Sequence, residues 1–275
     1  MADCVCALAL DGSVNANQAS TAHAHRLVRS WFLDPATAMI PDGAYARLSA
    51  VDASRNVLDA CIDFRDLYPL LDALTLLRQA GCFSLAEQQQ LEEWFDAFLA
   101  WLSEDSATFL SEHSGSAART WYHLLLLAIA AFRVKRNIAA QVFDNPPGLL
   151  ASQFRPDGSS RSAAADATLR HEQLFNLQAW ANLCLLSSTL GRDLLAFTDS
   201  SGISLQRAFS HAQRHLPGAE EVGAAGGFSP SHWLQAMQAL SHSDPALAPA
   251  PELPPLAEAS SGLPPFWNLC RSLAT

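Results

Sequence analysis

Two apolar stretches decide the fold: TWYHLLLLAIAAF at residues 120–132 and HEQLFNLQAWANLCLL at residues 171–186. Each lies in a segment with the length of a helix, 118–134 and 170–190, and each is apolar on nearly every face. Helices of this kind are expected to be buried on all sides. Between them the sequence Pro156-Asp157-Gly158-Ser159 marks a loop.

Outward from these two helices, other segments place apolar residues on one face only. A capping box at Ser84 and Glu87 predicts the start of one of them. Alternation of fully apolar with one-sided helices is typical of two helical layers, an inner ring lined by an outer ring, although an irregular helical bundle satisfies the same packing rules. We therefore expect an all-α fold, with further helices at 20–33, 66–80, 84–102, 137–152 (interrupted at Asn145-Pro146-Pro147), 201–216 and 231–242.

Composition narrows the function classes. The chain has 275 residues, of which 49% are apolar and 16% charged, as expected for a globular protein with a large core. A net charge of −10 and the lack of an Arg/Lys cluster predict no nucleic-acid partner. The longest apolar run, Leu124–Phe132, is far below the roughly 18 residues of a membrane span, so no membrane partner is expected. The first six residues make a poor signal peptide, which leaves the localisation unknown.

Four short motifs, in this order, resemble the alginate lyase family of polysaccharide lyases. The resemblance implies an α/α toroid, here expected as an incomplete double-layered helical barrel, because the family's N-terminal portion has no counterpart. It divides the chain into an N-terminal segment (1–19), the toroid domain (20–243) and a tail rich in Pro and Ala (244–275). The motifs are Trp31-Phe32-Leu33-Asp34-Pro35-Ala36-Thr37, Ile62-Asp63-Phe64-Arg65-Asp66-Leu67, Thr120-Trp121-Tyr122, and Pro156-Asp157-Gly158-Ser159 with His171 and Phe175-Asn176-Leu177.

The resemblance also implies a chemistry, β-elimination on a polyuronate such as alginate. The substrate carboxylate must be neutralised, a base takes the C5 proton, and an acid protonates the departing O4. Several family positions are substituted here. The Asn-His pair falls on Ala117-Ala118, the Arg on Asp166, and the Tyr on Glu172. A catalytically silent member that binds carbohydrate or a protein partner is therefore the alternative to an active lyase.

The remaining polar residues near these motifs supply the candidate site. We predict His171, Tyr122 and His123 as catalytic, and Arg119, Trp121, Arg170 and Arg65 as substrate-binding. Arginine suits this task because its planar fork pairs with a carboxylate through two hydrogen bonds. The competing interpretation gives the two histidines ordinary hydrogen bonds at the polar ends of core helices. The predicted partner is a polyuronate or another acidic polysaccharide.

The sequence gives little support for a metal site or a bound cofactor. The pairs His23-x-His25 and His211/His215 have spacings compatible with metal ligands, but no third ligand accompanies either pair. The sequence contains no Gly-rich nucleotide loop, no Gly-x-Ser-x-Gly and no His-Glu-x-x-His. We expect neither a metal nor a cofactor.

Overall fold

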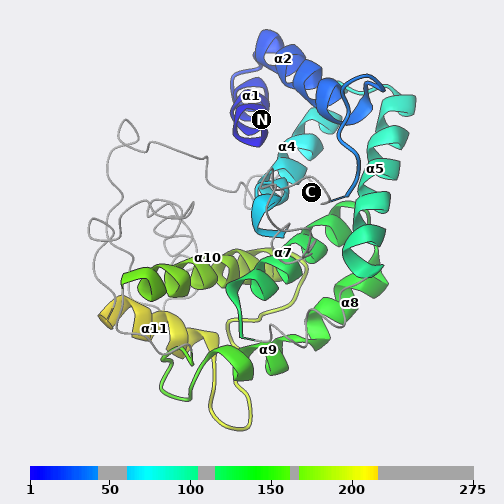
Figure 1. Ribbon diagram of the computed structural model, residues 1–275. Helices are drawn as coiled ribbons and strands as arrows, with labels where there is room; N and C mark the ends of the chain where they lie inside the picture. The colour runs from blue at the N-terminus through cyan, green and yellow to red at the C-terminus, as the bar shows by residue number, and fades with distance from the viewer. Residues whose placement is uncertain (43–60, 105–114, 162–166, 216–275) are drawn as a thin grey trace. The chain divides into compact units, whose positions relative to one another are not determined.

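The computed structural model describes residues 1–42, 61–104, 115–161 and 167–215 (Figure 1). Within these ranges every regular element is helical, apart from two isolated β-bridges. No helix in the described ranges is both long and apolar enough to cross a membrane. The predicted helix at 231–242 and the predicted tail from residue 244 lie outside the described residues.

The described residues form two compact units. Of the described residues, the first unit contains 1–42, 61–104 and 125–139, and the second contains 115–124, 140–161 and 167–215. The first unit contains α1 (Ala2–Val14), α2 (Gln18–Val28), the π-helix η1 (Arg29–Leu33), α4 (Leu67–Gln79) and α5 (Leu85–Glu104). The second contains α9 (Pro146–Gln153), α10 (Ala167–Thr189) and α11 (Leu205–His215), while α7 (Ala117–Phe132) and α8 (Arg136–Asp144) contribute residues to both.

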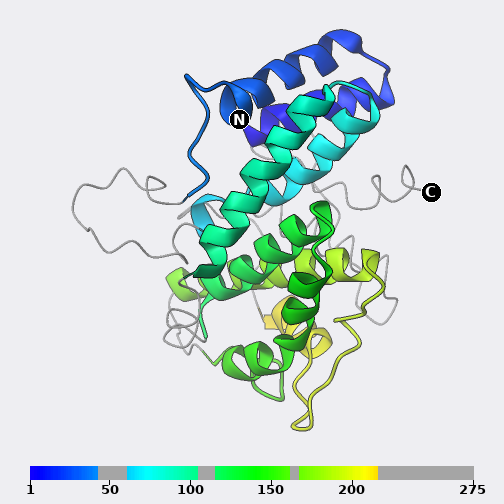
Figure 2. The ribbon, with the colours of Figure 1, turned by 90° about the vertical axis from the view of Figure 1, so that its right-hand side faces the viewer.

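In the first unit, α1 packs against both α2 and α4 (Figure 2). Its contact face is apolar, with Val5, Cys6 and Ala9 buried. The segment predicted to stand apart at the N-terminus thus contributes a helix to this unit. The predicted helix at 20–33 divides into α2 and η1, and it ends where expected, because Asp34 precedes a proline and adopts an extended backbone.

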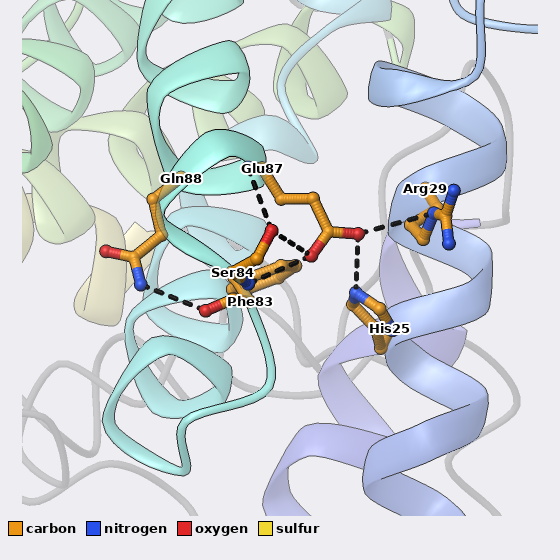
Figure 3. Close-up of polar contacts among 6 residues, drawn as sticks. All are labelled: His25, Arg29, Phe83, Ser84, Glu87 and Gln88. Atoms are coloured by element: carbon orange, nitrogen blue, oxygen red, sulfur yellow. Dashed lines mark hydrogen bonds and ion pairs between the residues drawn. The ribbon is translucent and has the colours of Figure 1, made fainter.

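The capping box is confirmed at the start of α5. The Ser84 amide donates to Glu87 Oε2 (2.9 Å), and the Glu87 amide donates to Ser84 Oγ (3.3 Å). The other Glu87 oxygen lies 3.2 Å from His25 Nε2 of α2 and 3.4 Å from Nε of Arg29, the first residue of η1 (Figure 3). One carboxylate therefore caps α5 and ties it to α2.

Aromatic rings fill the core between η1 and α5. The ring of Phe32 meets Trp94 edge-on, with the centroids 4.8 Å apart, and stacks on Phe95 at 5.8 Å. The Trp94 indole also donates to the Met39 carbonyl (2.8 Å), which fixes the segment that follows η1. The indole thus satisfies its donor while its rings remain buried.

In the second unit, α10 and α11 pack together (Figure 1). The loop before α10 is held by the turn at Asp157, whose Oδ1 accepts from the Ser159 amide (2.9 Å). Gly158 has a φ of 87°, and a Cβ there would lie 2.2 Å from the Arg207 carbonyl oxygen of α11. Only glycine satisfies both this backbone conformation and the close approach to α11.

Candidate functional site

A buried polar network joins α7, α9 and α10. At its centre is Gln153, whose Oε1 accepts from Asn176 Nδ2 (3.0 Å) and from Trp180 Nε1 (2.7 Å). Its Nε2 donates to the Ser116 carbonyl and to Thr120 Oγ1, both at 3.0 Å. Thr120 in turn donates to Asn176 Oδ1 (2.7 Å). The network holds the first turns of α7 at a fixed position on α10.

One face of α7 carries polar groups for which the described residues supply no hydrogen-bond partner. Ser116, Arg119 and His123 are spaced by three and four residues, which places them on one face of the helix. Among the described residues, Ser116 Oγ, Arg119 Nε and both ring nitrogens of His123 are buried and have no hydrogen-bond partner. Buried polar atoms normally have partners, so these three residues are candidates for contact with a ligand.

The electrostatics of this face favour a neutral imidazole beside a cation. Burial, together with the positive charge of Arg119, lowers the pKa of His123 to about 4. Burial also lowers the pKa of Arg119, although a guanidinium stays charged in proteins. At neutral pH the face therefore offers one fixed positive charge and one unprotonated ring that is able to accept a proton.

Two predicted residues next to this face are buried. Trp121 is 1% exposed and its indole lies against Phe175, with the ring centroids 5.0 Å apart. Tyr122 is 3% exposed, and its ring meets that of His123 edge-on at 5.5 Å. These contacts give both side chains a packing role. Their predicted roles in substrate binding and catalysis stay predictions.

The other predicted site residues belong to other elements of the chain. Arg65 belongs to the first unit, where its Nη1 donates to the Ile62 carbonyl (2.8 Å) and its Nε lies 3.8 Å from Asp66 Oδ1. Arg170 and His171 are in the first two turns of α10, and their side chains lie outside the described part of the chain. The assignments of these three residues to substrate binding and catalysis stay predictions.

Sequence reasoning missed Ser116 and Gln153. Gln153 is a buried polar residue in a short segment with Leu149, Leu150 and Phe154, all of which are buried. A polar residue in such a setting signals a buried hydrogen-bond network, although its partners are distant in sequence. Ser116 carries the helix spacing to Arg119 and His123, and this spacing would have identified it.

The histidines considered as metal ligands have other surroundings. His25 lies 3.2 Å from Glu87, as described above. In the described ranges of the chain, no group of three or more His, Cys, Asp and Glu side chains gathers as a metal site would require.

Comparison with known proteins places the chain in a family. The model of the alginate lyase family matches residues 1–222, which includes α1. A crystal structure of an alginate lyase from Bacteroides ovatus matches with a TM-score of 0.76 and 22% sequence identity, and the match covers 88% of this chain and 65% of that one. No curated protein matches the chain significantly. The chain thus spans less than two thirds of the solved lyase. It belongs to the alginate lyase family and has the all-α, α/α-toroid fold of that family.

Proposed function

We propose that this protein is a polysaccharide lyase that cleaves a polyuronate such as alginate by β-elimination. Family membership over residues 1–222 supports the reaction class and an acidic polysaccharide as substrate. The observation that carries the proposal within this chain is the face of α7 with Ser116, Arg119 and His123, whose buried polar atoms lack partners among the described residues.

The chemistry of that face suits a uronate. Arg119 pairs with the substrate carboxylate and so stabilises the negative charge that develops when the C5 proton leaves. Ser116 contributes a hydroxyl donor beside it. The C5–H and C4–O4 bonds break, a C4–C5 double bond forms, and the departing O4 receives a proton.

Proton transfer needs a base, and two histidines are candidates. His123 is unprotonated at neutral pH, but a pKa of about 4 makes it a weak base in the free protein. A bound carboxylate would raise this pKa, because a nearby negative charge favours the imidazolium. His171 matches the family motif and is the proposed second group, while Tyr122 is the proposed acid for O4.

Ultraviolet absorbance tests the proposal directly, because the new double bond is conjugated with the carboxylate. The protein is incubated with polymannuronate, polyguluronate and glucuronan. We expect a rising signal with at least one polymer, and a loss of about 100-fold or more in His171→Ala or Arg119→Gln. Arg136→Gln, which changes an exposed arginine at the start of α8, is the control with the same change in charge. A flat signal on all three polymers from folded protein would refute β-elimination on polyuronates.

The second candidate function is binding without turnover. It is favoured by the substitutions at Ala117, Ala118 and Glu172, where the family places its Asn-His pair and its Tyr. The 3% exposure of His123 also favours binding without turnover, because a catalytic base must reach the substrate proton that it removes. Retained binding of a polyuronate together with a flat ultraviolet signal would identify this function.

A further inference from the structure

A depression of about 550 Å³ lies between the Pro156-Asp157 turn and α11. Its lining comes entirely from the second unit, and none of it belongs to the α7 face described above. The lining residues are Pro156, Asp157, Gln206, Arg207, Ser210 and Arg214.

The helix contributes one of its faces to this depression. Gln206, Ser210 and Arg214 follow one another at intervals of four residues, and Arg207 is seven residues before Arg214. Seven residues are two turns, so the two arginines share a face and stand roughly 10 Å apart along the axis. The opposite face of α11 is buried, which leaves the arginine face to the surface.

Backbone carbonyls hold both guanidinium groups. Arg207 Nη1 donates to the Pro156 carbonyl (3.1 Å) and to the Gly202 carbonyl (2.9 Å), while Arg214 Nε donates to the Ser210 carbonyl (3.1 Å). Each bond uses part of a fork that has five N–H donors. The contacts that the structure records thus orient the forks and leave further donors for a ligand.

The charge of the depression is positive although the chain is acidic. Helix α11 has two arginines and no Asp or Glu, whereas the whole chain has a net charge of −10. The one carboxylate in the lining, that of Asp157, already accepts from the amide and the hydroxyl of Ser159. Two oriented cations two turns apart fit two carboxylates on one chain better than they fit a single small anion.

We propose that this depression is an accessory binding site for the carboxylates of an acidic polysaccharide, separate from the α7 face. Arg207 and Arg214 pair with two uronate groups of the same chain, and Gln206 and Ser210 supply hydrogen bonds to sugar hydroxyls. This inference rests on the proposed acidic polysaccharide as ligand, but not on its cleavage.

Affinity electrophoresis in native gels containing polymannuronate measures the binding. Mobility is compared with that in gels containing a neutral polysaccharide, which corrects for each variant's own charge. Arg214→Gln should weaken binding about threefold, and the double variant Arg207→Gln/Arg214→Gln about tenfold, because exposed ion pairs contribute modestly. Arg161→Gln should bind as the wild type does. Arg161 is the matched control, since it is an exposed arginine whose Nε donates to a single carbonyl, that of Ala151 (2.7 Å), outside the depression.

The outcomes separate this inference from the proposed function. Binding that falls in the Arg214 variant, in a protein that gives no ultraviolet signal, supports the accessory site and refutes the lyase reaction. Cleavage with binding unchanged in both arginine variants refutes the accessory site alone. Failure of the wild type to bind any one of polymannuronate, polyguluronate and glucuronan overturns the accessory site, whereas the lyase reaction is judged by the ultraviolet signal alone. The double variant loses the hydrogen bonds from Arg207 to the Pro156 and Gly202 carbonyls. If that loss unfolds it, the single variant Arg214→Gln still tests the site.

Discussion

Substitution of Gln153 by methionine tests whether the buried network stabilises the second unit. Methionine has a similar volume but neither donates nor accepts strongly. It would leave the Trp180 and Asn176 donors without their acceptor and the Ser116 carbonyl without its donor, while Thr120 keeps its bond to Asn176. A buried polar group left unpaired costs about 1–3 kcal/mol. With two such donors and some relaxation, we expect the free energy of unfolding to fall by about 3–5 kcal/mol.

Guanidinium denaturation followed by tryptophan fluorescence and circular dichroism measures this change. Gln89→Met is the matched control, because the Gln89 amide is exposed and makes one hydrogen bond, to Glu93 Oε1 (2.9 Å). The control should change the free energy by less than about 0.5 kcal/mol. If the Gln153 variant loses less than about 1 kcal/mol while its helix content is intact, the network does not have the energetic role assigned to it.

Three further predictions concern stability. Burial lowers the pKa of His123 to about 4 in the folded protein, against about 6.5 for an exposed histidine, so the free energy of unfolding should fall by up to about 3 kcal/mol as pH drops from about 6.5 to 4. Denaturation curves of His123→Gln should lack this part of the pH profile. Gly158→Ala should lower the free energy of unfolding by about 1–3 kcal/mol, seen as a lower melting temperature, because the added Cβ would collide with the Arg207 carbonyl of α11. Gly148→Ala in α9 is the control: its added Cβ meets nothing within 4 Å, so it should be neutral or stabilising. Glu87→Gln keeps an oxygen for the capping box but loses the negative charge near His25 and Arg29, so it should lower the free energy of unfolding by about 0.5–1 kcal/mol. High salt should reduce this difference. Glu93→Gln is the exposed control in the same helix.

The pKa of Glu87 is lowered for a different reason from that of His123. Burial works to raise the pKa of this carboxyl, but hydrogen bonds from Ser84 and the charges of His25 and Arg29 outweigh it and hold the pKa below its usual range. Its stabilising contribution is therefore present above the usual pKa of a glutamate and is lost as pH falls through the lowered folded value.

Local signals in the sequence predicted the helices well. The capping box at Ser84 starts α5, and the helix predicted over 20–33 ends at Leu33, the last residue of η1. Each of these signals acts within a few residues, so a single sequence contains all the information needed. The π-helical turn at Arg29–Leu33 was not predicted, since a π-helix and an α-helix have the same apolar residues on the same faces over one turn.

Contacts between distant residues were beyond sequence reasoning. Gln153 meets Asn176 and Trp180 only after α9 and α10 have packed together, and no local pattern encodes that encounter. Sequence reasoning did find Arg119 and His123, but its competing interpretation gave His123 ordinary hydrogen bonds. The structure records none for that ring among the described residues.

The most direct test of the proposed function is the mass of the products released from a polyuronate. β-Elimination yields oligosaccharides that are one water lighter than those from hydrolysis, because no water is added when the glycosidic bond breaks. We predict such unsaturated oligouronates from the wild type and none from His171→Ala or Arg119→Gln. Intact polymer after prolonged incubation with folded wild-type protein, or products of hydrolytic mass, would contradict the account.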